Sequence, residues 1–264
     1  MINIIYVVAG ILVGMLSGIF GIGGGIITFP VIYIGLTKFY HFPANTAFHL
    51  AATTALIITI PTLISTAISR KEQHQIKLKL VIKLIPGVIL GVIVTTQYLI
   101  NIINIQVVKH LFLVTTTLIA IQFYFNYMPT KNITKSSSRI SDFITGFLIG
   151  AIATLLGITG GEYTASYLNY HKVPIKQVAG TTAIIGLIIS ILGSIGFIYH
   201  GLMVAQTTHN YANFVNIAAL VEIGAASLIM AYLANKFLNH LKTSFLSKIF
   251  AIIIFSSGIV MVMV

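Results

Sequence analysis

Two glycine clusters, one with a carboxylate beside it, are the residues of this chain that most readily suggest chemistry. The segment GIFGIGGGIITFP at 18–30 holds five glycines, and GITGGE at 157–162 repeats the cluster and adds Glu162. Glycine inside a helix costs about 0.5–1 kcal/mol relative to alanine, so such clusters break a helix. A helix that begins just after a break presents unpaired N–H groups and a partial charge of about +0.5, which together can bind an anion.

We therefore predict that the two glycine clusters form a site for a small anion near the middle of the membrane. A non-helical backbone at that depth is tolerated only where protein or a wet cavity surrounds it. Glycines spaced by four residues, such as Gly10 with Gly14 and Gly146 with Gly150, are better explained by close helix packing. The predicted substrate-binding positions in the clusters are Gly21, Gly23, Gly24 and Gly25 in the first, and Gly157, Thr159, Gly160 and Gly161 in the second.

Polar pairs at helical spacing accompany both clusters. His49 and Thr53 are four residues apart and so share a helix face, and Gln177 and Thr181 repeat the arrangement. We predict that these four residues line the cavity and donate hydrogen bonds to the anion. The alternative is that the threonines bond back to carbonyls of their own helices. An interfacial role is predicted for the histidines near the ends of apolar runs, which are His110, His200, His209 and His240.

The chain has four acidic residues, and two of them lie within apolar stretches. An intramembrane carboxylate is a functional hypothesis by default, so Glu162 and Glu222 are predicted to be proton-coupling residues. The alternative is a structural hydrogen bond within the helix bundle. Glu72 and Asp142 have ordinary explanations, because one lies in a basic loop and the other at a helix start.

Composition places these residues in an all-α, polytopic integral membrane protein. Of the 264 residues, 57% are hydrophobic and 7% are charged, and the mean hydropathy is +1.01. A water-soluble surface typically carries about 25–35% charged residues. The absence of cysteine excludes disulfides and thiol chemistry. The net charge of +11 lies in short loops, which suits anionic lipids at the cytoplasmic face, and we expect no nucleic acid partner, metal or cofactor.

The two halves of the chain resemble each other. GILVGMLSGIFGIGGGI at 10–26 aligns with GFLIGAIATLLGITGGE at 146–162, and HLAATTA at 49–55 aligns with QVAGTTA at 177–183. We predict two transmembrane repeats, 1–127 and 142–264, joined by a basic cytoplasmic linker at 128–141. Each repeat would hold about five membrane segments, roughly eight to ten in total, and would open with a hairpin that turns at its glycines.

The basic residues predict that the repeats are inverted. If each repeat has five segments, all of the 15 Lys and Arg except Lys38 and Lys109 fall on one side of the membrane. The positive-inside rule makes that side cytoplasmic and places both termini outside. Inverted repeats with a broken helix in each copy are typical of secondary transporters.

The motifs GIGGGIITFP and AGTTA, each in one half of a chain of this length, resemble the TauE/SafE family, also called the sulfite exporter or 4-toluene sulfonate uptake permease family. The resemblance covers essentially the whole chain. It implies movement of sulfite, sulfonates or other small sulfur-containing anions across the bacterial inner membrane. The second motif departs from the family's pattern, with Thr159 in place of glycine, Glu162 in place of an apolar residue, and Ser166 where the first copy has Pro30.

Together these features predict a secondary transporter of a small anion that works by alternating access in the cell inner membrane. No phosphate-binding Walker loop is present, so we expect passive or ion-driven transport, with protons as the candidate coupling ion. The alternatives are an anion channel or, less favoured, an intramembrane hydrolase built on His49 and Glu162. No catalytic motif supports an enzyme. The oligomeric state stays open, with a homodimer as one alternative.

Overall fold

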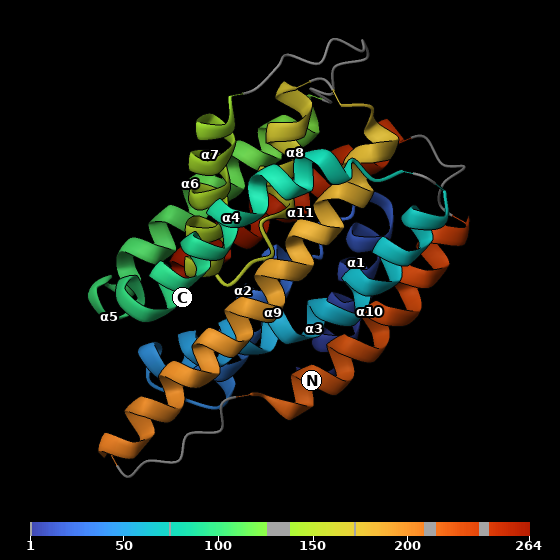
Figure 1. Cartoon of the computed structure of the whole chain (residues 1–264). Coiled ribbons are helices and arrows are strands. Elements are labelled where there is room, and N and C mark those ends of the chain that lie inside the picture. The colour runs from blue at the N-terminus through green and yellow to red at the C-terminus, as the bar shows by residue number, and fades with distance from the viewer. Residues whose placement is uncertain (1, 74, 126–137, 172, 209–214, 238–242) are drawn as a thin grey trace.

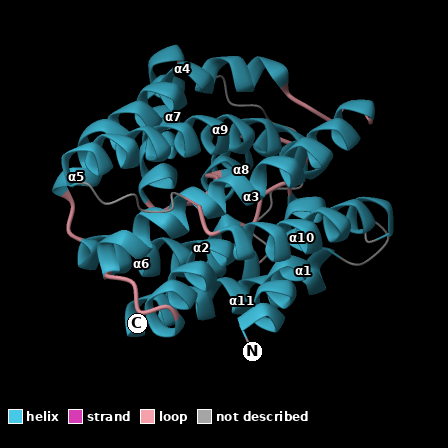
Figure 2. Ribbon diagram, turned by 90° about the horizontal axis from the view of Figure 1, so that it is seen from below, coloured by secondary structure: helices cyan, strands magenta, loops and turns pink. Residues whose placement is uncertain are grey.

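The computed structural model describes residues 2–73, 75–125, 138–171, 173–208, 215–237 and 243–264. Within these ranges every regular element is a helix and none is a strand (Figure 2). Six of the helices are long and apolar enough to cross a membrane. The predicted all-α, polytopic membrane class is therefore confirmed.

In the described part of the chain, five principal helices end before residue 126 and five begin after residue 137 (Figure 1). Short π-helical turns at Gly35–Phe39 and Thr95–Leu99 extend α2 and α4, and α5 (Ile100–Ile102) follows the second of them. The first five principal helices are α1 (Ile2–Phe20), α2 (Gly25–Ile34), α3 (Ala44–Glu72), α4 (Leu78–Val94) and α6 (Ile105–Tyr124). The second five are α7 (Arg139–Leu155), α8 (Gly161–Tyr170), α9 (Ile175–Thr208), α10 (Ile217–Phe237) and α11 (Thr243–Met263).

The predicted glycine breaks are present in both halves. Helix α1 ends at Phe20 and α2 begins at Gly25, while α7 ends at Leu155 and α8 begins at Gly161. The residues just before α2 and α8 are Gly24 and Gly160, with φ of +75° and +70°. This left-handed conformation is readily adopted by glycine and strains most other residues. Glycine therefore ends each long helix and lets a ten-residue helix start at a new angle.

Helices pair across the two halves in a matched pattern. α1 packs along α10 and α4 packs along α7, while α3 pairs with α9 and α6 pairs with α11 (Figures 1 and 2). A two-fold axis between the halves would place the α1–α10 pair on the α4–α7 pair. It would also exchange the two helices within the α3–α9 pair and within the α6–α11 pair. The division into repeats at 1–127 and 142–264 stays a prediction. Their inversion across the membrane stays a prediction.

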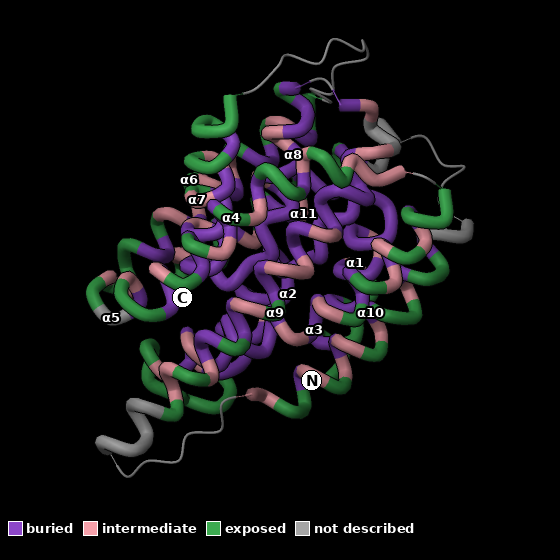
Figure 3. Tube along the Cα trace, in the orientation of Figure 1, coloured by how far each residue is buried: buried purple, intermediate pink, exposed green. Residues whose placement is uncertain are grey.

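Buried residues concentrate around α2, α8 and the facing sides of α3 and α9 (Figure 3). The outer surface carries large exposed apolar side chains, including Ile82, Leu118 and Ile195, whose exposed fractions are 67%, 62% and 58%. Apolar exposure of this extent is rare on a water-soluble monomer and is the normal state of a lipid-facing helix. The short broken helices thus lie in the interior, where backbone irregularity is tolerated.

Candidate anion site

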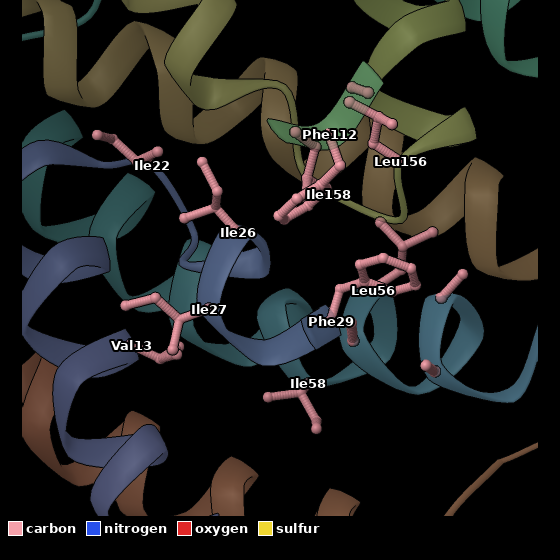
Figure 4. Close-up of a cluster of buried hydrophobic side chains, with 14 of the residues drawn as sticks. Val13, Ile22, Ile26, Ile27, Phe29, Leu56, Ile58, Phe112, Leu156 and Ile158 are labelled. Carbon is pink, nitrogen blue, oxygen red and sulfur yellow. The ribbon is translucent and has the colours of Figure 1, made fainter. Parts of the chain in front are cut away.

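The two glycine breaks meet at the centre of the protein. A Cβ atom on Gly25 would lie 3.0 Å from Ile158 Cα, and one on Gly161 would lie 2.8 Å from Ile22 Cα. The first residue of α2 therefore lies against the second break, and the first residue of α8 lies against the first break. Figure 4 shows Ile22 and Ile158 in the buried apolar cluster around this crossing. The sequence predicted the breaks, and the structure brings them into contact.

Thr159 ties the two breaks together. Its hydroxyl Oγ1 donates a hydrogen bond of 2.5 Å to the carbonyl oxygen of Ile22, and its side chain is fully buried. The same side chain fills the space beside Gly23, where a Cβ atom would lie 2.8 Å from Thr159 Cγ2. In this structure the hydroxyl proton of Thr159 is thus engaged by the other half of the chain.

The remaining predicted glycines pack against neighbouring helices at the same crossing. Gly24 and Gly160 lie against the helices that precede them, where a Cβ atom would come within 2.7 Å of Val13 and 2.9 Å of Ala153. Gly21 lies against α9 and Gly157 lies against α3. All eight predicted break positions are buried, and the four that lie at the contact between the two breaks are Gly23, Gly25, Thr159 and Gly161.

This arrangement places two helix N-termini next to each other. The first N–H groups of α2 and α8 have no partners within their own helices, and each terminus carries a partial charge of about +0.5. The chemistry of such a pair is attraction for an anion. The described structure brings two such termini together, and the binding of an anion by them stays a prediction.

Glu162 lies in the first turn of α8, beside the crossing. Its side chain is 1% exposed, and neither carboxylate oxygen has a hydrogen-bond partner among the described residues. Glu222 is elsewhere: it is half-buried on α10 and interacts electrostatically with Tyr6 of α1. Of the two predicted proton-coupling residues, the structure thus places only Glu162 at the breaks.

His49 lines a cavity of about 290 Å³ together with a second histidine, His200. The two rings stack with a centroid distance of 5.6 Å and an interplanar angle of 15°. Leu155, the last residue of α7, also lines the cavity, which therefore reaches the start of the second break. The further lining residues are Asn45, Phe48, Ile100, Ile103, Ile105 and Val108.

His200 was missed as a cavity residue because the sequence suggested that a span ends near residue 200. Helix α9 in fact continues to Thr208, so His200 lies inside the helix and faces the start of α3. The signal that could have identified it is the antiparallel pairing of α3 with α9. That pairing sets a residue near the start of one helix beside a residue near the end of the other.

The threonines of the predicted polar pairs behave as the alternative interpretation expects. Thr53 Oγ1 donates to His49 O at 2.8 Å, and Thr181 Oγ1 donates to Gln177 O at 2.6 Å. Thr181 Oγ1 also accepts a hydrogen bond of 3.0 Å from the backbone N–H of Lys77. The hydroxyls are thus occupied here, and a role for Thr53, Gln177 and Thr181 in substrate binding stays a prediction.

Arg70 caps the helix that leads into the first break, a role that sequence reasoning missed. Its side chain is 7% exposed, and Nη2 donates to the carbonyls of Gly18 at 3.2 Å and Ile19 at 3.4 Å. Nη1 donates to Gln75 Oε1 at 3.0 Å. A cation at the C-terminal end of a helix complements the helix dipole. No feature of a single sequence distinguishes Arg70 from the exposed Lys71 beside it.

Asp142, at the start of α7 as the sequence indicated, pairs with a lysine of α4. The side chain is fully buried in the first turn of α7, and Oδ2 lies 3.5 Å from Lys83 Nζ of α4. Tyr167 of α8 donates a hydrogen bond to Oδ1. Among the described residues, no group of three or more His, Asp or Glu side chains is placed to hold a metal ion.

Comparison with known proteins decides the family. The family described as sulfite exporter TauE/SafE matches residues 6–261. The chain belongs to the TauE/SafE family. This TauE/SafE protein is 27% identical, over 247 residues, to a probable membrane transporter protein of Haemophilus influenzae, covering 92% of this chain and 91% of that protein. No solved structure matches the chain.

Family membership confirms the resemblance and makes the protein a membrane transporter. Thr159, Glu162 and Ser166, singled out in the second motif, all lie in α8 or just before it. Thr159 bonds to the first break, Glu162 lies buried beside it, and Ser166 Oγ donates to Gln122 Oε1 at 2.5 Å and to Glu162 O at 3.0 Å. The second break is thus the more polar of the two.

Proposed function

We propose that this TauE/SafE protein is a secondary transporter of a small anion, namely sulfite, a sulfonate or another sulfur-containing anion. The observation that carries the proposal is the contact between the breaks, which sets the N-termini of α2 and α8 side by side. Two such termini offer several N–H donors and positive potential from both repeats. An oxyanion accepts hydrogen bonds on several oxygens at once, which suits this set of donors.

Alternating access is supported by the difference between the two ends of the α3–α9 pair. At the end that holds His49, a cavity reaches the second break. At the other end, Arg70 binds the carbonyls of Gly18 and Ile19, and the backbone of Lys77 binds Thr181. His49 and Gln177 occupy equivalent positions in the two predicted repeats. The end of the α3–α9 pair at His49 therefore has a cavity, whereas the equivalent end at Gln177 is closed by hydrogen bonds. Exchange of the two arrangements would open the opposite side.

We further propose that transport is coupled to protons through Glu162, with Glu222 as the second candidate. An ionised carboxylate buried without a partner is costly, so a neutral, protonated Glu162 suits the site. An anion about 4 Å from an ionised Glu162 would be repelled by about 4 kcal/mol at an effective dielectric of 20. Binding of substrate would therefore require the proton, which links the two fluxes.

The hydrolase alternative is less well supported by this geometry. It requires His49 and Glu162 in one site, yet the cavity lined by His49 does not have Glu162 in its lining. We propose instead a non-enzymatic carrier in the bacterial inner membrane. Its basic loops would face anionic lipids of the cytoplasmic leaflet.

A ligand screen by thermal shift tests the proposal with purified protein. Sulfite, thiosulfate and methanesulfonate are compared with acetate and with methanesulfonamide, a neutral analogue of the sulfonate. A ligand at about 100 times its Kd adds about 2.7 kcal/mol to stability. We expect stabilisation by at least one sulfur-containing anion and none by methanesulfonamide. Equal stabilisation by the neutral analogue, or stabilisation by acetate alone, would contradict the proposed substrate class.

A further inference from the structure

Lys109 occupies an unusual position for a cation. It lies close to the N-terminus of α6, which begins at Ile105, and its side chain is 5% exposed. Partial loss of water around the ammonium group adds a cost in free energy. None of the contacts described for the break glycines or for Thr159 involves Lys109.

The surroundings of Lys109 do not compensate its charge. Its Nζ lies 5.3 Å from the ring centroid of Tyr33, which is itself 1% exposed. The charged neighbour is Lys38, in the π-helical turn that extends α2, and the two positive charges repel each other. All four acidic residues are described, and none of them lies within 4.0 Å of either lysine. A cation–π contact is a modest substitute for a carboxylate.

Lys109 adjoins the cavity that holds the two histidines. Ile105 and Val108, on the same turn of α6, line that cavity. A continuous series of rings connects the two places, because Tyr33 contacts Phe29 at 6.2 Å, Phe29 contacts Phe48 at 5.6 Å, and Phe48 contacts His49 at 5.5 Å between centroids. Lys38 and Lys109 are also the two basic residues that the loop charges place outside the cytoplasm.

We propose that Lys109 and Lys38 form a capture site for a small oxyanion beside the histidine cavity. One anion bound by the two ammonium groups would offset their mutual repulsion and the burial of Lys109. The capture site would raise the local concentration of anions before they enter the cavity. This proposal deepens the proposed function and rests on it, because the captured anion would be the transported substrate.

Lys248 offers a matched control. It lies over the ring of Tyr124, with Nζ 5.8 Å from the centroid, on the corresponding last principal helix of the second half. Unlike Lys109, it is exposed. Lys248→Met therefore removes a lysine from a similar ring contact without changing a buried charge.

The test compares the thermal stability of wild type, Lys109→Met, Lys109→Arg and Lys248→Met in detergent, with sodium sulfite or sodium sulfate added at constant ionic strength. We expect a saturating anion to raise the Tm of wild type, Lys109→Arg and Lys248→Met by about 5 °C. Lys109→Met should bind at least about tenfold more weakly. Without added anion it should be more stable than wild type, because the buried charge is gone.

Three outcomes would overturn the capture site. The first is an anion-induced rise in Tm that is unchanged in Lys109→Met, and the second is no rise in Tm of wild type. The third is a rise in Tm of wild type with phosphatidylglycerol and not with sulfite or sulfate, which would assign the lysines to a lipid headgroup. Uptake of anions into proteoliposomes is measured separately. Uptake that is independent of Lys109 overturns this inference and leaves the transport function standing. Binding that depends on Lys109, without uptake of any anion, leaves the capture site standing and contradicts the transport function.

Discussion

The hydrogen bond from Thr159 to Ile22 is the most specific link between the two breaks, and Thr159→Val removes it. Valine has nearly the shape of threonine and lacks the hydroxyl. The bond measures 2.5 Å, and the exposed fractions of Thr159 and Ile22 are 0% and 1%. Water therefore cannot replace the lost donor at this carbonyl.

The expected cost follows from that burial. Leaving a buried acceptor without its donor costs about 1–3 kcal/mol. For a protein of this size each kcal/mol lowers the melting temperature by roughly 2–4 °C. We therefore expect Thr159→Val to melt about 2–12 °C below wild type in a detergent thermal-unfolding assay.

Thr164→Val is the matched control for this measurement. Thr164 is fully buried in α8, and its hydroxyl donates to Gly160 O at 2.9 Å. That carbonyl also accepts a bond of 3.0 Å from the Thr164 backbone N–H, so it keeps a donor in the variant. Thr164→Val should therefore cost clearly less than Thr159→Val. Equal melting temperatures for the two variants would refute the reasoning that the Thr159 bond holds the breaks together.

Three further predictions address the break, the coupling and the topology. Gly24→Val should abolish transport while the protein still inserts, because φ is +75° and a Cβ atom would lie 2.7 Å from Val13. Uptake at the wild-type rate in this variant would show that Gly24 serves only helix packing. Glu162→Gln should bind the anion with little pH dependence and lose pH-driven accumulation in liposomes, whereas wild type binds more tightly at acidic pH; unchanged pH dependence of both properties would make Glu162 a structural residue. In this cysteine-free chain, cysteines at Thr208 and at Lys135, which lies outside the described residues, should react with impermeant reagents from opposite sides of the membrane; labelling from one side would contradict the inverted repeats.

The positions of the breaks could be predicted from the sequence because their cause is local. Adjacent glycines such as Gly23 and Gly24 disfavour helix wherever they occur, so the ends of α1 and α7 followed directly. The contact between the breaks is different in kind. It joins Ile22 to Thr159, which are far apart in the chain, and no local pattern specifies such a pairing.

The residues that sequence reasoning missed depend on long-range packing in the same way. In the sequence, Arg70 is one of several basic residues at the end of an apolar run. In the structure, the end of α1 lies beside it, and carbonyls of α1 accept its hydrogen bonds. His200 joins His49 only because α9 runs antiparallel to α3 and extends past residue 200. Thr53 and Thr181 had two local interpretations, and the structure shows the hydrogen bonds of the one that needs no ligand.

Counterflow in proteoliposomes tests the proposed carrier function most directly. Purified protein is reconstituted with a high internal concentration of unlabelled sulfite, or of the sulfur-containing anion that stabilises it best, and a trace of labelled anion is added outside. A carrier that alternates between two sides accumulates the label transiently above equilibrium, and its initial rate saturates with concentration. We predict both behaviours. Equilibration of the label without transient accumulation, at rates that do not saturate, would show a channel and contradict alternating access through the paired breaks.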